Sequence, residues 1–204
     1  IVTIEHNGKK LVDLPITETS EDNLTDKSCL TIENIVAFAD CLDVEDVRDS
    51  VGAQIEKNMA IAAEGLKNSW GANIGSVILR RQVGGVEKIA CAWAAAGSDA
   101  RMNGCPMPVV INSGSGNQGI SATVPVVVFG REKGVSEEKL LRALALSHLT
   151  VVYIKQSLGR LSALCGCVVA ATGSSCGITY LMGGEFNEVC FAVKNMVANL
   201  TGMI

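Results

Sequence analysis

A glycine-rich stretch with several amide and hydroxyl side chains is the first candidate for chemistry in this 204-residue sequence. Residues 111–126 read INSGSGNQGISATVPV, and Gly114, Gly116 and Gly119 have the spacing G-x-G-x-x-G. In dinucleotide-binding folds this spacing joins a buried strand to a helix whose N–H groups hold the pyrophosphate. Here Pro125 follows closely, and a proline breaks or kinks a helix interior. The sequence therefore argues against a dinucleotide site.

The same stretch forms a turn that is rich in hydrogen-bond donors. Successive backbone N–H groups in such a turn create a concavity that binds anions, so a small carboxylate or phosphate is one expected ligand. A structural turn that lets two helices pass closely is an equal alternative. The candidate ligand-binding residues are Asn112, Ser113, Gly114, Ser115, Gly116, Asn117, Gln118 and Gly119.

Three basic residues have both a functional and a structural interpretation. His148 lies on the apolar face of a helix expected after Ser136, as an acid–base group or as a hydrogen-bonded core residue. Lys155, on the same face, is a general base if desolvated, or a lysine near the helix-end carbonyls. Arg101 either holds a carboxylate bidentately or forms a surface ion pair with Asp99.

The elements that position these residues are mainly helical. Helical spacing predicts helices over 31–41, 43–68 and 86–96, one that begins at Ser136, and one over 187–202. The uncharged residues 102–130 contain three prolines and predict buried irregular backbone. Residues 161–184 also lack charge, but their serines and threonines favour a buried central helix over a membrane span.

The N-terminal segment predicts a small β-hairpin. Residues 1–14 alternate apolar and polar side chains around Asn7-Gly8, a favoured two-residue hairpin turn. We therefore expect residues 1–27 to form the edge of a domain that lies mostly upstream, and residues 28–204 to form a helical bundle-like domain truncated at its C-terminus. The whole is predicted to be a fragment of a longer α+β protein.

Composition excludes several function classes. The net charge is −4 and aromatic residues make up 4% of the chain, so neither basic runs nor stacking platforms suggest nucleic-acid binding. Eight cysteines are too sparse for a disulfide scaffold, which favours a reducing cytoplasm. The only close pair, Cys165 and Cys167, does not have the common zinc or ferredoxin spacing.

Several segments together resemble the serine dehydratase α-chain superfamily, in its L-cysteine desulfidase-like branch. The segments are SDARMNG (98–104), NSGSGNQGI (112–120), ALSHL (145–149), RLSALCG (160–166), YLMGG (180–184) and NLTGMI (199–204). The resemblance implies a cytoplasmic, oxygen-sensitive lyase with a [4Fe–4S] cluster on three cysteines and no pyridoxal phosphate. The cluster's open iron acts as a Lewis acid on L-cysteine, giving pyruvate, ammonia and sulfide; L-serine is the alternative substrate.

The resemblance assigns one cluster ligand to this chain. Cys165 matches the family's middle ligand, while Cys167, Cys176 and Cys190 match none and are expected to pack in the interior. The other two ligands are expected beyond Ile1 and Ile204, so this chain alone should be apo and inactive. The resemblance also implies that the glycine stretch holds the substrate carboxylate. The rival from another class is a non-catalytic amino-acid-binding or regulatory domain. Either way we expect a small amino-acid ligand and no membrane; homo-oligomerisation stays open.

Overall fold

The computed structural model describes residues 2–14, 26–81, 84–158 and 165–200. Strands β1 (Val2–His6) and β2 (Lys9–Leu14) form the expected antiparallel hairpin. Asn7 and Gly8 at its turn have φ values of +50° and +71°, the pair of positive angles that a tight hairpin turn needs. Among the described elements the two strands contact only each other.

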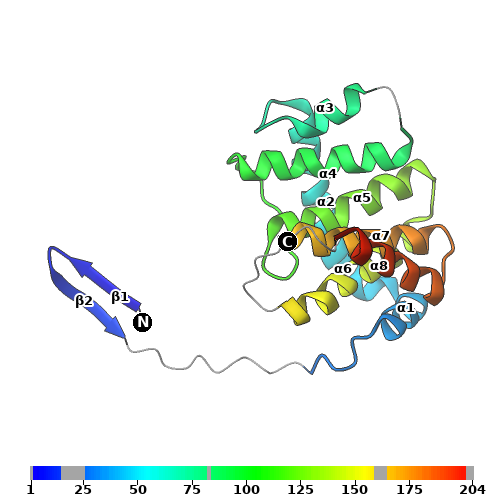
Figure 1. The fold of residues 1–204 in the computed structure, drawn as a ribbon, viewed down its shortest axis with the longest axis horizontal. Helices are drawn as coiled ribbons and strands as arrows, with labels where there is room; N and C mark the ends of the chain where they lie inside the picture. The colour runs from blue at the N-terminus through cyan, green and yellow to red at the C-terminus, as the bar shows by residue number, and fades with distance from the viewer. Residues whose placement is uncertain (1, 15–25, 82–83, 159–164, 201–204) are drawn as a thin grey trace.

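The rest of the described chain is helical, which confirms the mainly α class. In Figure 1 the helices gather into one body, with α3, α4 and α5 following one another across it. The helices are α1 (Ile32–Cys41), α2 (Val44–Lys67), α3 (Ile74–Arg80), α4 (Val86–Met102), α5 (Gly116–Glu132), α6 (Glu137–Leu158), α7 (Gly166–Leu181) and α8 (Phe186–Leu200).

Several helix ends are set by local side chains. Thr31 begins α1 by accepting a hydrogen bond from the backbone N–H of Asn34. Asp43 caps α2 in the same way, as the sequence predicts, and Ser136 Oγ accepts from the N–H of Lys139 at 3.2 Å. Such caps satisfy N–H groups that have no partner within the helix. The predicted positions of these three helices are therefore confirmed.

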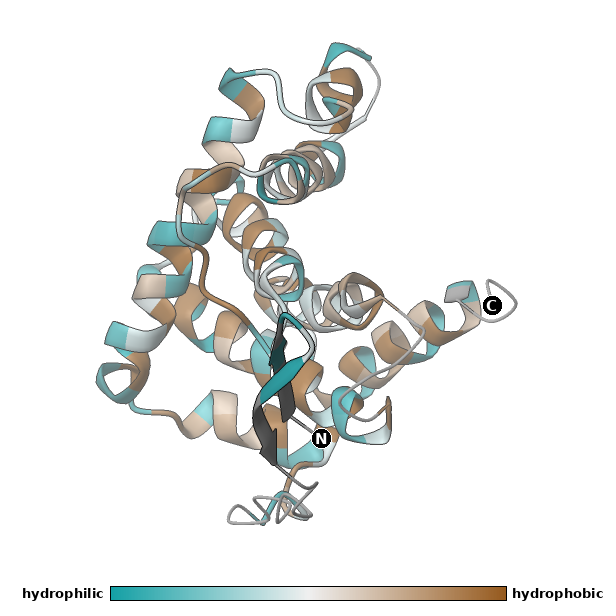
Figure 2. Ribbon diagram, turned by 90° about the vertical axis from the view of Figure 1, so that its left-hand side faces the viewer, coloured by the Kyte–Doolittle hydropathy of each residue, from teal (hydrophilic) through white to brown (hydrophobic). Residues whose placement is uncertain are grey.

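Helix α5 is the centre of the body. It packs against α2, α4, α6 and α7, and most of its side chains are buried. In Figure 2 hydrophilic and hydrophobic segments alternate along the outer helices, as amphipathic helices require. A helix covered on all sides needs no such alternation, which matches the uncharged sequence of α5 before Arg131.

The prediction of irregular backbone over residues 102–130 was wrong for its second half. Helix α5 begins at Gly116 and passes through Pro125. The proline costs one helical hydrogen bond, but the contacts of a buried helix outweigh its low propensity. The helix that the proline argument excluded is therefore present. No strand precedes it in described residues 103–111, so the remaining parts of a dinucleotide fold are not seen there.

Two smaller corrections concern neighbouring helices. Helix α4 does not stop at Gly97 but continues to Met102; an added Cβ at Gly97 would lie 3.2 Å from Ile120 and 3.3 Å from Ala62. The glycine thus serves close helix packing rather than termination. The short helix α3 was not predicted, because seven residues carry too little periodic signal.

Helix α7 is a buried helix of the body, as expected, although residues 159–164 at its predicted start lie outside the described residues. Gly173 and Gly177 face the backbone carbonyls of Ser147 and Ala143 on α6, closer than a side chain would allow. Within the described residues no helix is long and apolar enough to cross a membrane.

Candidate functional site

The glycine-rich stretch is a tight turn that opens directly into α5. Asn112 and Ser115 exchange backbone hydrogen bonds of 3.1 and 3.0 Å around Ser113 and Gly114, whose φ values are +46° and +86°. Ser115 is the N-cap of α5, and its side chain accepts from the N–H of Gln118. The turn therefore presents the N-terminal end of the central helix.

Two glycines of this stretch permit close approach. An added Cβ at Gly119 would collide with the carbonyl oxygen of Val110, and one at Gly116 would collide with Nε of Arg101. The segment before the turn thus lies against the first turns of α5, and the guanidinium lies over the helix start. Part of the glycine pattern is therefore explained by the close packing of a non-helical segment and an arginine side chain on α5.

Behind the turn lies a buried polar network, which we call the closed face: Asn58, Asn112, Thr123 and His148. Asn112 Nδ2 lies 2.9 Å from His148 Nδ1 and donates to the His148 carbonyl at 3.3 Å. Its Oδ1 accepts from the Ser113 hydroxyl and from Gln118 Nε2. The other ring nitrogen of His148, Nε2, lies 3.2 Å from Thr123 Oγ1.

These contacts are mutually consistent for one tautomer of His148. Thr123 donates its hydroxyl proton to the Gly119 carbonyl at 2.8 Å, so it accepts from His148 Nε2–H. Nδ1 then accepts from the Asn112 amide. Burial lowers the pKa of His148 to about 4, so the ring is neutral near pH 7. Both nitrogens are occupied by protein groups, which matches the core-residue interpretation of this histidine.

Asn58 on α2 completes the closed face and was missed by the sequence reasoning. Its amide binds the backbone of Val110 on both sides: Oδ1 accepts from the Val110 N–H at 2.9 Å, and Nδ2 donates to the Val110 carbonyl at 3.1 Å. It also donates to Thr123 at 3.3 Å. A signal was present: Asn58 follows Ile55 by three residues, so it lies on the apolar stripe of its helix, where an unpaired amide is costly.

The N-terminal ends of α5 and α7 and the last turn of α4 form a second cluster, which we call the open face: Arg101, Asn117, Cys165 and Cys167. Arg101 Nη1 donates to Asn117 Oδ1 at 3.1 Å. Cys167 is half-buried beside this cluster, and the Arg101 charge acts on its thiol. Burial is the main cause that raises the pKa of the Cys167 thiol. The fold thus joins two segments that lie about 50 residues apart in the sequence.

Gln118 lies between the two faces and carries an unsatisfied atom. Its side chain is fully buried, Nε2 donates to Asn112, and Oε1 has no hydrogen-bond partner. An added Cβ at Gly166 would collide with this Oε1, so the oxygen lies against the first turn of α7. A buried acceptor without a donor costs free energy, and such atoms often mark ligand sites.

Cys165 is exposed and occupies the N-cap position of α7. The described residues contain no group of three His, Cys, Asp or Glu side chains close enough to hold a metal ion. An exposed thiol at a helix start suits one ligand of an iron–sulfur cluster, since the helix dipole favours an anion there. The described residues therefore provide one ligand of such a cluster and not the complete set of ligands.

The remaining predicted residues lie elsewhere. Lys155 is half-buried in the last turn of α6, about 10 Å along the helix axis from His148. Asp99, the expected partner of Arg101, instead accepts from the backbone N–H of Ile74 at 2.8 Å. Cys176 is fully buried, as expected, and its pKa is raised to about 12 by burial, with a smaller contribution from nearby Cys190.

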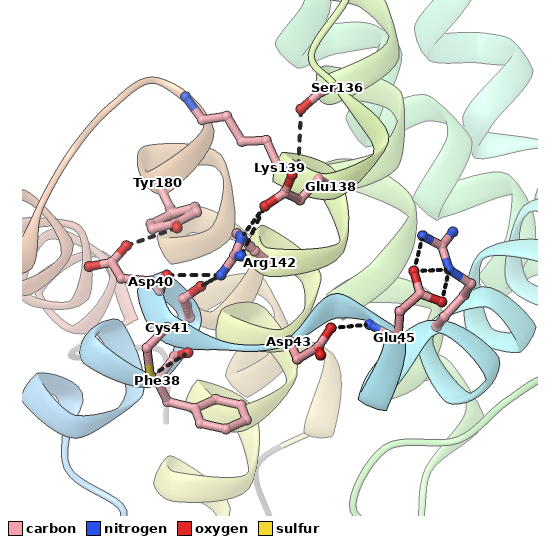
Figure 3. A network of polar contacts seen from close by, with 12 residues as sticks. Phe38, Asp40, Cys41, Asp43, Glu45, Ser136, Glu138, Lys139, Arg142 and Tyr180 are labelled. Atoms are coloured by element: carbon pink, nitrogen blue, oxygen red, sulfur yellow. Dashed lines mark hydrogen bonds and ion pairs between the residues drawn. The ribbon is translucent and has the colours of Figure 1, made fainter.

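A separate polar network lies around Arg142 (Figure 3). Arg142 Nη1 donates to the carbonyls of Ala39 and Asp40 at 2.8 and 2.9 Å, and the guanidinium pairs with Glu138. The Tyr180 hydroxyl donates to Asp40 Oδ1 at 2.9 Å. A cation at the C-terminal carbonyls of a helix is favourable, so this network fastens α1 to α6 and α7.

Two surface cavities of about 490 Å³ each lie away from the glycine-rich turn. One is lined by Ser175 and Thr179 of α7 and by residues of α8 such as Phe191. The other lies beside Asp40 and Tyr180. Neither cavity is lined by residues of the closed or open face.

Comparison with known proteins gives one family. Residues 9–204 match the serine dehydratase alpha chain family. A UPF0597 protein of Bacteroides thetaiotaomicron is 51% identical over 100% of this chain and 48% of its own length. A UPF0597 protein of Desulfitobacterium hafniense is 44% identical over 100% and 47%, and one of Fusobacterium nucleatum is 44% identical over 89% and 44%. The chain thus spans about half the length of these relatives. No solved structure matches.

Proposed function

Because the chain belongs to the serine dehydratase alpha chain family, we propose that its full-length protein is an iron–sulfur lyase that converts L-cysteine to pyruvate, ammonia and sulfide. The observation that carries this proposal is the convergence of three features at the N-terminal ends of α5 and α7: Arg101 lies over Gly116, Gln118 of the glycine-rich turn lies against Gly166, and Cys165 precedes Gly166 as the N-cap of α7. An anion site beside an exposed thiol is what an amino-acid substrate and a thiolate-held cluster require.

The substrate carboxylate is assigned to the start of α5. The N–H groups of a helix N-terminus attract an anion, and the Arg101 guanidinium above Gly116 adds a full positive charge with several donors. Asn117 accepts from Arg101 and fixes its orientation. The unpartnered Oε1 of Gln118 would accept from the substrate ammonium, which has three donors and no acceptor.

Cys165 is assigned as one cluster ligand, and the others would come from outside the described residues. When bound, the cluster would supply a Lewis acid for the departing thiol. This chain's own part is to hold Cys165 at the start of α7 while Gly166, which lacks a side chain, lets Gln118 lie against the same turn.

His148 is proposed as a positioning residue. Its two ring nitrogens hold Asn112 and Thr123, so the imidazole fixes the turn from behind. Lys155 stays a prediction as the general base. Replacing His148 with Ala in the full-length protein should cut turnover sharply; near-normal turnover would reduce it to a packing residue.

The proposal is tested on the full-length protein, reconstituted anaerobically with iron and sulfide. Pyruvate is assayed with L-cysteine and L-serine offered separately, beside a Cys165→Ala variant and a Cys91→Ala control, which removes another exposed thiol. Pyruvate that disappears only in Cys165→Ala supports the lyase. Equal pyruvate from Cys165→Ala and the unmodified protein would refute the ligand assignment.

Two alternatives remain distinguishable. The family description favours L-serine as substrate, and a larger kcat/KM for L-serine would establish that choice. The incomplete donor set within the described residues favours a non-catalytic amino-acid-binding domain. Calorimetric binding of L-cysteine or L-serine, without any pyruvate from the reconstituted full-length protein, would support that domain instead.

A further inference from the structure

We propose that the backbone carbonyl of Ser121 is a second acceptor for the ammonium of the amino-acid substrate, and that Pro125 keeps this carbonyl free for it. The inference rests on the amino-acid site of the proposed function and adds two residues to that site. Both belong to α5 and lie one and two turns beyond Asn117, the residue that accepts from Arg101.

A narrow accessible stripe runs along the central helix. Between Gly116 and Gly130 only Asn117, Ser121 and Pro125 are half-buried, and every other residue is buried. Residues four apart share one face of a helix, so these three form a single stripe that begins at the open face. A ligand bound at the open face therefore meets Ser121 as the next accessible residue of α5.

The stripe lies between α4 and α7, which both pack on α5 and do not contact each other within the described ranges. Figure 1 shows α5 between these two helices. On one side of the stripe, Ile120 lies 3.2 Å from where a Cβ on Gly97 of α4 would be. On the other side, Gln118 lies against Gly166 of α7. The stripe is therefore the part of α5 that neither helix covers.

Pro125 removes the usual partner of the Ser121 carbonyl. In an α-helix the carbonyl of residue 121 accepts from the N–H of residue 125, and proline has no N–H. The proline ring also pushes that carbonyl away from the helix axis. The next carbonyl, that of Ala122, accepts from the Ser147 hydroxyl at 2.9 Å. In the described part of the chain no side chain donates to the Ser121 carbonyl in this way, so it is available to a ligand.

An ammonium group matches the acceptors on this face of α5. Gln118 Oε1 is buried without a partner and borders the stripe on its α7 side. An ammonium has three donors, so one acceptor does not satisfy it, and the Ser121 carbonyl supplies another. Asn117 and Ser121 are about 6 Å apart along the helix axis. A small amino acid with its carboxylate at Arg101 therefore extends toward Ser121 with its ammonium.

The test is Pro125→Ala in the full-length protein, because this change restores the missing N–H, which then occupies the Ser121 carbonyl. Affinities are measured by calorimetry under nitrogen, without the cluster, so that no turnover occurs. L-Cysteine and L-serine should bind about 10- to 100-fold more weakly, the range of one charge-assisted hydrogen bond. Their analogues without the ammonium, 3-mercaptopropionate and 3-hydroxypropionate, should bind the variant and the unmodified protein equally.

Two further readouts separate recognition from folding. The melting temperature of Pro125→Ala should be unchanged or higher, because proline is unfavourable inside a helix. The restored amide should exchange its hydrogen slowly, since it donates within the helix, and fast exchange would overturn the proposal. Pro108→Ala is the matched control: Pro108 is exposed and lies outside the helices, so all four affinities should stay unchanged.

The outcomes distinguish this inference from the proposed function. Equal losses for an amino acid and its analogue, or no loss for either, would overturn the role of Ser121, and pyruvate from the reconstituted protein would leave the lyase intact. Neither binding nor pyruvate from the unmodified protein would refute the amino-acid site and this inference with it. If Pro125→Ala does not fold, Pro125→Val restores the same N–H with a side chain closer in size to proline, and the same affinities decide.

Discussion

The closed and open faces of the glycine-rich turn differ in how completely their polar groups are satisfied. On the closed face, each ring nitrogen of His148 and each amide atom of Asn58 has a protein partner. On the open face, Cys165 is exposed and the neighbouring Gln118 Oε1 has no partner. A network whose polar groups are all paired stabilises one conformation. A ligand that pairs with an unpartnered group removes the free-energy cost of that group, which favours binding. Stability and binding should therefore be separable by mutation.

The largest loss of stability should follow Asn58→Ala. The change leaves the N–H and carbonyl of half-buried Val110 without their side-chain partner, and an unsatisfied group that is buried costs about 1 to 3 kcal/mol. We expect the free energy of unfolding to fall by about 2 to 5 kcal/mol in urea titrations. Asn68→Ala, which removes one exposed hydrogen bond to Glu64, is the matched control and should be near neutral.

The second effect is a pH dependence from His148. Its pKa lies near 4 in the folded protein and near 6.5 when unfolded, so the unfolded state binds the proton first as pH falls. Stability is fully present above pH 6.5 and should decrease by about 3 kcal/mol on approach to pH 4. Denaturant titrations between pH 4 and pH 6.5 give the free energy of unfolding at each pH, and this free energy should change less with pH in His148→Gln. An unchanged pH dependence would assign the effect to other groups.

The third prediction concerns the open face and should affect catalysis without affecting stability. Arg101→Met removes the proposed carboxylate partner, and a charge-assisted hydrogen bond contributes about 1.5 to 3 kcal/mol. We expect kcat/KM of the full-length enzyme to fall about 10- to 100-fold, with unfolding free energy changed by less than about 0.5 kcal/mol. Arg131→Met, at the exposed far end of α5, is the control. A large stability loss with normal kcat/KM would reverse the roles of the two faces.

The smallest effect is expected at Gly114. An added Cβ there meets no atom within 4 Å, but the positive φ of 86° disfavours any side chain. Gly114→Ala should therefore cost about 1 kcal/mol, from backbone strain alone. The melting temperature measures it, with Gly52→Ala as the control: Gly52 is helical and uncrowded, and the change should stabilise by about 0.5 to 1 kcal/mol. Equal effects of the two changes would show that the positive φ does not decide the cost at Gly114.

Sequence reasoning succeeded where local signals and burial agree. The hairpin around Asn7-Gly8 and the capped helices α1, α2 and α6 were predicted because turn residues, caps and apolar spacing point the same way. Helix α5 was missed because its stability comes from contacts with the helices around it. These contacts outweigh the helix-breaking effect of Pro125, and they cannot be seen in a local sequence pattern.

The same limit applies to the site. The glycine-rich turn could be selected from its residue types, and Cys165 from the family resemblance. The convergence of their segments could not be predicted, because it depends on how α5 packs on α7. The clamp of Asn58 on Val110 joins residues 52 apart and required the structure.

The central position of α5 also determines which surface of the chain is uncovered during synthesis. Its neighbours α2 and α4 precede it in the chain, but α6 and α7 follow it. As synthesis proceeds from the N-terminus, this helix, which is uncharged up to Arg131, emerges before half of its cover exists. Until α7 leaves the ribosome, the nascent chain exposes this surface to other proteins. Chaperone binding should therefore concentrate in the interval between the synthesis of α5 and that of α7.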